Sequence, residues 1–190
     1  FNADMNGARR EGVAYYQQNR KGRFRAQPAQ TYLRQARRRP NLDVKTEATV
    51  TRVLIEGSKA VGVEYRQGGE LRTIRVNREV IVSAGALKSP HLLQLSGIGD
   101  PAHLASLGIE VRVAAPGVGQ NLRDHFQLRV GHRVQGVITL NERTRGWPLI
   151  KEVLNYTVLG KGMLTMGAGT AALFARSRDG LAEADMQLIF

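Results

Sequence analysis

The feature that most restricts the fold is a short apolar run that ends in small residues. Residues 80–82 are Val-Ile-Val without alternation, which is typical of a strand buried on both faces of a parallel sheet. Residues 83–86, Ser-Ala-Gly-Ala, come next, and small side chains there let a ligand approach the backbone. Ligands of open α/β sheets bind at the carboxyl ends of strands. The run therefore predicts an α/β domain with a ligand beside these small residues.

Two helices with recognisable ends follow. Ser89 is the expected N-cap of the first, with Pro90 at the first helical position, and Gly97 follows its end. Asp100 is the expected cap of the second helix, and Gly108 ends it. Two capped helices directly after a buried strand support the α/β interpretation.

The remaining segments are predicted from alternation, β-branched residues and turn residues. Residues 48–55, 60–65 and 71–76 predict an antiparallel meander, with a hairpin turn at Gly68-Gly69. Further strands are expected at 109–113, 127–134 and 186–190, and helices at 28–38 and 149–159. Residues 1–25 are polar and punctuated by glycine, so they predict a long loop.

Basic residues are concentrated near the start of the chain. The net charge is +12, and residues 9–39 hold ten basic residues against the single acid Glu11. Such a segment can bind the phosphates of a nucleic acid. Single-strand binders, however, use aromatic residues among the basic ones as stacking platforms, and no such platform is predicted for this segment. We therefore expect a solvated face whose counter-charges lie on other parts of the protein, and no nucleic-acid partner.

Several kinds of site and location are disfavoured by what the sequence lacks. There is no cysteine, and the four histidines show no metal-binding spacing, so we expect no disulfide and no metal site. No apolar run reaches the ~20 residues that span a bilayer, and no signal peptide is recognisable. We therefore expect no transmembrane segment and a cytoplasmic location.

Two stretches resemble the signatures of one enzyme family. Residues 85–99 read Gly-Ala-Leu-Lys-Ser-Pro-His-Leu-Leu-Gln-Leu-Ser-Gly-Ile-Gly and resemble the second signature of the glucose–methanol–choline (GMC) oxidoreductases throughout. Residues 116–125, Pro-Gly-Val-Gly-Gln-Asn-Leu-Arg-Asp-His, are similar to a further motif of that family. Shorter similarities lie in family order at 6–12, 39–42 and 62–65. The resemblance covers most of the chain.

The resemblance implies an FAD-dependent enzyme that transfers a hydride from an alcohol to the flavin. It also implies a fold: part of an FAD-binding Rossmann-like domain, with a parallel sheet plus a β-meander, followed by the start of an α+β substrate domain. The expected ranges are 1–25 for a connecting or lid segment, 26–122 for the second half of the FAD-binding domain, and 123–190 for the start of the substrate-binding domain. The implied cofactor contacts are Thr49, Val50, Ser83, Ala84, Gly85 and Asn121. Thr49 and Val50 would lie along the adenine, although a core strand is an equally good interpretation of Val50.

The same resemblance places two functional elements outside the chain. The GxGxxG fingerprint that holds the pyrophosphate would precede Phe1, and the catalytic histidine would follow Phe190, so we expect no catalytic residue here. Asp124-His125 is expected to fix the loop between the domains and not to act as a general base. The expected partners are an alcohol substrate, an electron acceptor that the sequence does not identify, and the remaining segments of the same enzyme. Alternatives are a flavin-free scaffold with the same fold and a basic nucleic-acid-binding module.

One position bears on the substrate. In choline-oxidising relatives, a glutamate two positions beyond the Asp-His pair faces the quaternary ammonium. Here that position is Gln127, next to Phe126. A neutral amide cannot compensate a buried cation, and one aromatic ring contributes only ~1–2 kcal/mol. The sequence therefore predicts a neutral primary or aromatic alcohol, with Phe126 and Gln127 on the substrate side.

Overall fold

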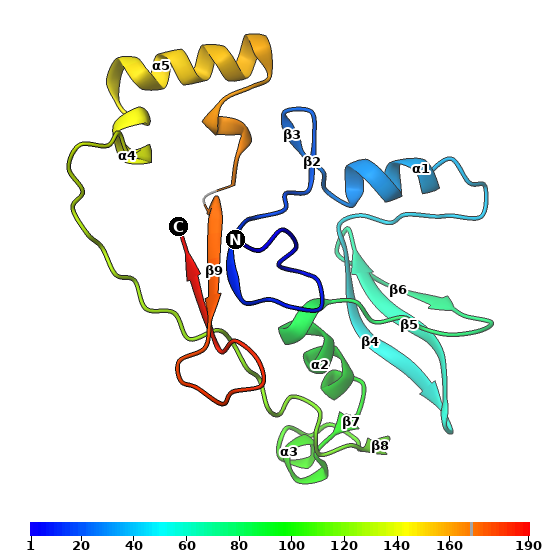
Figure 1. Ribbon diagram of the computed structural model, residues 1–190. Coiled ribbons are helices and arrows are strands. Elements are labelled where there is room, and N and C mark those ends of the chain that lie inside the picture. The colour runs from blue at the N-terminus through cyan, green and yellow to red at the C-terminus, as the bar shows by residue number, and fades with distance from the viewer. Residues whose placement is uncertain (168) are drawn as a thin grey trace. The chain divides into compact units, whose positions relative to one another are not determined.

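The computed structural model describes residues 1–167 and 169–190, and its elements are shown in Figure 1. Contacts divide the described chain into two units. One comprises residues 43–131, and the other combines residues 1–42 with 132–190. Within the described residues, no helix has both the length and the apolar character needed to span a bilayer.

The unit of residues 43–131 is built on the predicted meander. Strands β4 (Ala48–Glu56), β5 (Lys59–Gln67) and β6 (Glu70–Arg75) form an antiparallel sheet in the order β4-β5-β6. The turn at Gly68 and Gly69 has φ of 60° and 84°, which glycine adopts without strain. The meander is therefore confirmed, with strand ends that differ from the prediction by two residues at most.

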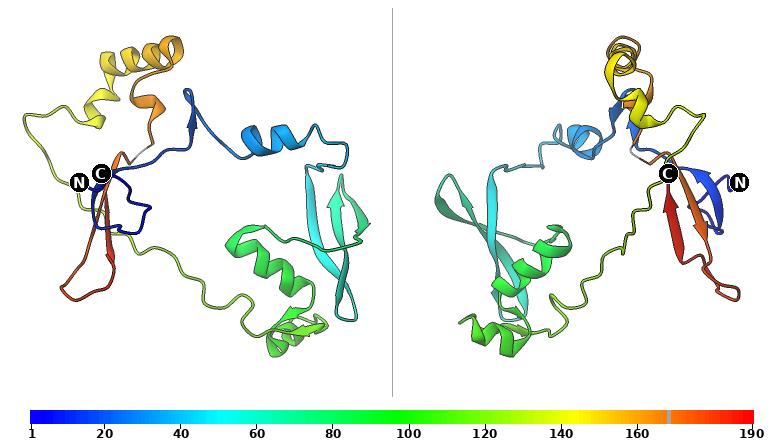
Figure 2. Two further views of the ribbon diagram at one scale, coloured as in Figure 1. Left: turned by 45° about the vertical axis from the view of Figure 1, so that its right-hand side comes forward. Right: turned by 90° about the vertical axis from the view of Figure 1, so that its left-hand side faces the viewer.

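Helix α2 (Gly85–Leu95) packs against β4, and Figures 1 and 2 show the two side by side. Strand β7 (Ile98–Gly99) then pairs in parallel with β8 (Val113–Ala114), and α3 (Pro101–Ser106) lies between them in the chain. The predicted ends of α3 are confirmed: Asp100 Oδ1 accepts a hydrogen bond from the His103 amide at 2.8 Å, and Gly108 has a φ of 69°.

Three predictions for this unit are wrong. Residues 80–82 form no strand, and Ile81 is 77% exposed, because no described strand lies beside them as a parallel partner. The strand expected at 109–113 is only β8, at 113–114. Residues 127–131 of the strand expected at 127–134 have no strand partner either, and neither do residues 132–134 of the other unit.

Helix α2 also begins earlier than predicted. It starts at Gly85, and Pro90 lies inside it. Ser89 does not occupy the N-cap. Its Oγ instead accepts a hydrogen bond from the amide of Ala84, the residue that precedes the helix, at 3.1 Å. The serine therefore stabilises the start of the helix from its second turn.

The other unit contains a three-stranded antiparallel sheet in the order β1-β9-β10. Its strands are β1 (Gly12–Tyr15), β9 (Ala171–Ala175) and β10 (Met186–Ile189). Met5, Ala14 and Ala172 form its small core. A hairpin of β2 (Arg20–Lys21) and β3 (Phe24–Arg25) follows β1. The prediction of a loop over residues 1–25 is therefore wrong, because β1 pairs with a strand more than 150 residues away.

Helices complete this unit. The predicted helix at 28–38 is present as a π-helical turn, η1 (Ala29–Leu33), followed by α1 (Arg34–Ala36). Helix α4 (Leu140–Arg143) precedes α5 (Gly146–Leu154), which continues into the π-helical turn η2 (Asn155–Leu159), and the helix predicted at 149–159 is confirmed. A short 3-10 helix, η3 (Met163–Thr165), leads toward β9. The prediction of a strand at 186–190 is confirmed by β10.

Candidate functional site

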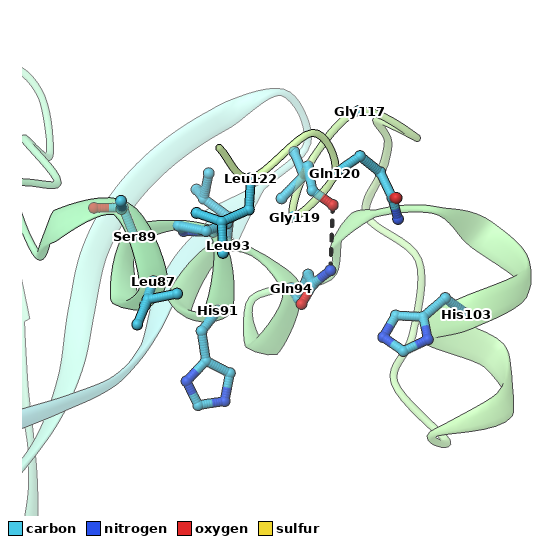
Figure 3. A pocket seen from close by; sticks show the side chains of 13 residues that line it. Leu87, Ser89, His91, Leu93, Gln94, His103, Gly117, Gly119, Gln120 and Leu122 are labelled. Carbon is cyan, nitrogen blue, oxygen red and sulfur yellow. Dashed lines mark hydrogen bonds between the residues drawn. The ribbon is translucent and has the colours of Figure 1, made fainter. Parts of the chain in front are cut away.

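The two signature stretches meet around one hollow in the unit of residues 43–131. It encloses about 620 Å³ and is bounded by α2, α3 and the loop of residues 117–122 (Figure 3). Gln94 joins two of these walls, because its Nε2 donates a hydrogen bond to the carbonyl of Val118 at 3.2 Å. Gly119, with a φ of 81°, passes so close to Gln94 that an added Cβ would lie 2.7 Å from Nε2. The loop therefore rests directly on the helix.

The amino-terminal end of α2 is open. Gly85 has a φ of 87°, and an added Cβ would meet no described atom within 4 Å. Glycine is favoured there by its backbone conformation, since other residues are strained at positive φ. The surface beside Ser83, Ala84 and Gly85 is exposed and lacks bulky side chains until Leu87.

The carboxyl-terminal end of α2 is crowded. An added Cβ on Gly97 would lie 2.5 Å from the carbonyl oxygen of Glu110 and 2.8 Å from Cγ of Arg112. Ser96 is buried, and its Oγ accepts a hydrogen bond from the Val53 amide at 2.8 Å. The same hydroxyl donates to the carbonyl of Leu92 at 2.6 Å. This half of the signature therefore joins α2 to β4 and to the segment that leads into β8.

The predicted cofactor residues are only partly brought together. The hollow begins at Ala86, directly after Gly85, and includes Gln120 and Leu122, the two neighbours of Asn121. Asn121 itself has a φ of 58°, a conformation that asparagine tolerates better than most residues. Thr49 and Val50 lie on β4 and do not line the hollow. Their role along an adenine stays a prediction.

The substrate-side residues have few contacts. Phe126 is 96% exposed, and Gln127 is exposed as well. Asp124 Oδ1 accepts a hydrogen bond from the amide of the next residue, His125, at 2.7 Å, which is a local contact. The expected role of this pair in fixing an interdomain loop therefore stays a prediction.

Polar residues of the meander bind one another across neighbouring strands. Thr51 Oγ1 donates to Glu64 Oε1 at 2.7 Å, and Arg52 pairs with Glu64 Oε2 at 2.7 Å. The hydrogen bond from Thr51, followed by that from Arg52, lowers the pKa of Glu64. Gly62 lies so close to β6 that an added Cβ would be 2.4 Å from the carbonyl oxygen of Ile74. The family-like stretch at 62–65 is thus explained by packing.

Sequence reasoning missed two features of this site. One is Gln94, whose polar side chain interrupts a run of leucines and joins the helix to the loop. The other is the pair His91 and His103, which line the hollow from different helices (Figure 3). No three His, Asp or Glu side chains within the described ranges gather closely enough to hold a metal ion.

Comparison with known families decides what this arrangement belongs to. The family model described as GMC oxidoreductase matches residues 1–127. The chain is a member of the GMC oxidoreductase family. The mixed α/β fold and the two signature stretches around the hollow agree with that membership.

GMC relatives cover nearly the whole chain. A GMC-type oxidoreductase of Mycobacterium bovis is 42% identical over 99% of the chain and 35% of its own length. An oxygen-dependent choline dehydrogenase of Burkholderia vietnamiensis is 39% identical over 93% of the chain and 31% of its own length. The chain thus spans about a third of the length of these relatives.

Solved oxidoreductase structures share the fold. A fungal aryl-alcohol oxidase superposes with a TM-score of 0.73 at 29% identity, covering 86% of this chain and 29% of that one. An FAD-dependent oxidoreductase of Chaetomium thermophilum superposes with a TM-score of 0.70 at 26% identity, covering 81% of this chain and 28% of that one.

Proposed function

We propose that this chain is part of an FAD-dependent oxidoreductase that oxidises an alcohol. Membership of the GMC family supports the proposal, as do the names of its relatives, which include a choline dehydrogenase and an aryl-alcohol oxidase. FAD, when bound, would accept the hydride that leaves the alcohol carbon. The chain's own contribution is to bind and orient that cofactor, and the catalytic base would be supplied by a segment outside residues 1–190.

The observation that carries the proposal is the open surface at the start of α2. Gly85 is held at positive φ, yet no described atom occupies the space where a side chain would lie. A glycine in this conformation, flanked by other small residues and followed by a hollow, suits a ligand that approaches the backbone. The surface therefore leaves room for a cofactor to lie against the backbone.

The residues proposed to hold FAD are the ones predicted from the sequence. Ser83, Ala84 and Gly85 would let the dinucleotide approach the main chain, and Asn121 would contribute from the loop that rests on α2. Thr49 and Val50 are proposed to contact the adenine from β4, where Val50 is 38% exposed. The first backbone amides of a helix have no partner within the helix, so the start of α2 offers hydrogen-bond donors to a polar ligand.

Further segments of a longer enzyme are the proposed partners of both units. The chain exposes 15958 Å², whereas two separate compact bodies of the same total mass would expose together roughly 11,000 Å². The excess supports the view that other segments cover these surfaces. We retain the division into a lid segment (1–25), an FAD-binding part (26–122) and a substrate part (123–190) as a proposal.

Replacing Gly85 tests the cofactor site. Gly85→Ala and Gly108→Ala introduce the same side chain at φ of 87° and 69°, and neither Cβ meets a described atom within 4 Å. Both should cost about 1 kcal/mol of backbone strain. Only Gly85→Ala should lower the flavin content of the full-length enzyme, measured by visible absorbance against protein concentration. Equal flavin content in the two variants would refute the placement, and a wild-type enzyme without flavin would favour the scaffold alternative.

The substrate is proposed to be a neutral primary or aromatic alcohol. Gln127 offers no charge to a quaternary ammonium, and the exposed ring of Phe126 provides weak compensation at most. Benzyl alcohol should therefore have a higher kcat/KM than choline in the full-length enzyme with an artificial acceptor. Gln127→Glu should shift that ratio toward choline by about tenfold, whereas Gln35→Glu, at an exposed position on α1 outside the hollow, serves as a charge-matched control. A wild-type preference for choline would contradict the proposal.

A further inference from the structure

A second hollow lies in the unit of residues 1–42 and 132–190. It encloses about 1040 Å³ and is lined by residues from 16–29 on one side and by residues 156, 164–167 and 169 on the other. Two arginines connect these walls. Arg20 Nη1 donates to Thr165 Oγ1 at 2.8 Å, and Arg23 Nη1 donates to the carbonyl of Tyr156 at 3.1 Å. The hairpin of β2 and β3 is thus held against the end of η2 and against η3.

The charge of this hollow is one-sided. Arg20, Arg23 and Arg25 line it, and none of its described lining residues is acidic. None of the three arginines takes part in the ion pairs found among the described residues. Their partners are neutral: a hydroxyl for Arg20, and for Arg23 two carbonyls and the ring of Phe24, 5.5 Å from the guanidinium carbon. Positive charge therefore accumulates without compensation.

The hairpin register concentrates that charge further. Arg20 pairs directly with Arg25 across the two strands, and Lys21 pairs with Phe24. Residues directly opposite in an antiparallel pair have their side chains on the same face, and like charges there are destabilising. An anion between the two guanidinium groups would reverse this repulsion. Arg23 already donates hydrogen bonds to two carbonyl groups of η2. Arg20 and Arg25 therefore have the N–H donors that can bind an anion.

The rest of the lining suits an organic ligand. Tyr16, Phe24, Tyr156, Leu164 and Met166 provide aromatic and apolar surface, while glutamine and asparagine side chains provide amides. Guanidinium groups bind carboxylates through two parallel hydrogen bonds. We propose that this hollow binds a small organic carboxylate with an aromatic or apolar body, held by Arg25 and Arg20. This hollow belongs to the other unit of the chain, and the proposal does not depend on the proposed cofactor surface.

Three ligands with one ring and different charges test the proposal. Benzoate, benzamide and benzyltrimethylammonium carry charges of −1, 0 and +1, and each can be titrated into the full-length, flavin-loaded enzyme by calorimetry. Benzoate should bind at least about tenfold more tightly than benzamide, and the cation should show no binding. A wild-type enzyme without a preference for benzoate would overturn the proposal, including the case in which a carboxylate of another segment already fills the hollow.

Substitutions locate the site. Arg25→Gln should weaken benzoate binding by about tenfold or more and leave benzamide unaffected, whereas Arg25→Lys should have a smaller effect because it keeps the charge. Arg34→Gln, outside the hollow, is the matched control. Because Arg25 faces a like charge, Arg25→Gln should not lower the unfolding temperature of the ligand-free enzyme. Unchanged benzoate affinity in Arg25→Gln, or a loss of stability that accounts for the weakened binding, would contradict the assignment.

Discussion

The two ends of α2 carry the same family signature and are built in opposite ways. At the amino-terminal end, Gly85 faces open space, and a side chain there would meet no described atom within 4 Å. At the carboxyl-terminal end, Gly97 lies against the backbone of Glu110, and Ser96 is buried. Both glycines have positive φ, at 87° and 82°. A signature can therefore combine a surface left free for a ligand with a joint that only stabilises the fold.

The largest effect is expected at the crowded end. Gly97→Ala adds a Cβ 2.5 Å from a backbone oxygen and 3.2 Å from Cβ of Arg112, neither of which can move without shifting the chain. Overpacking and strain at positive φ together predict a loss of about 3 kcal/mol in the free energy of unfolding. Gly108→Ala brings the same backbone strain at positive φ, but its Cβ overlaps no described atom, so it should lower the free energy of unfolding by only about 1 kcal/mol. Urea denaturation of the two variants measures this difference. Equal losses in the free energy of unfolding would show that Gly97 is not more tightly packed than a glycine in open space.

An intermediate effect is expected from Ser96. Ser96→Ala leaves the buried Val53 amide without its 2.8 Å partner, which should cost about 2 kcal/mol in the free energy of unfolding. Ser106→Ala removes a hydroxyl that donates to the carbonyl of His103 at 2.7 Å on an exposed surface, and it should cost under about 0.5 kcal/mol. If both variants retain full flavin content, the joint is purely structural. A loss of flavin in Ser96→Ala alone would show that the carboxyl-terminal end of α2 also contributes to cofactor binding.

The smallest effect on stability is expected from Gln94, which lies between the two ends. Gln94→Ala removes one partly buried hydrogen bond of 3.2 Å and should cost about 1 kcal/mol or less. Because this bond fixes the loop of residues 117–122 on the helix, flavin should be released at lower denaturant concentration. Gln187→Ala removes an exposed 2.7 Å hydrogen bond to the Tyr16 hydroxyl in the other unit and is the control. Identical flavin release in both variants would show that the loop is held by other contacts.

Local signals predicted the elements that depend on local contacts. The ends of α3 were predicted because the cap at Asp100 and the exit at Gly108 involve residues within a few positions. The meander was predicted because its turns are short and its strands adjacent. The start of α2 was misplaced because Ser-Pro looks like a helix start, whereas Ser89 stabilises the amide of Ala84 from inside the helix.

Long-range pairing could not be predicted. Among the described strands, β1 pairs only with β9, so its short sequence predicted a loop. The apolar run at 80–82 was interpreted through neighbours that no described residue provides. For the site, the sequence motifs identified two stretches that both line one hollow, whereas the cofactor role of Gly85 and Asn121 stays a prediction. The pairing of Arg20 with Arg25 was missed. The register of the β2–β3 hairpin is set by the turn at Gly22, and a cluster of like charges gives no signal for it.

The hydroxyl of Ser96 also affects whether strand β4 can pair with a strand of another molecule. Strand β4 is nine residues long and, among the described strands, pairs only with β5, so its other edge could accept a strand from another chain. Unpaired strand edges are templates for aggregation. The Val53 amide near the middle of that edge is already occupied by Ser96, and α2 packs alongside. Ser96 and helix α2 thus occupy part of this edge together, which disfavours its pairing with a strand of another chain.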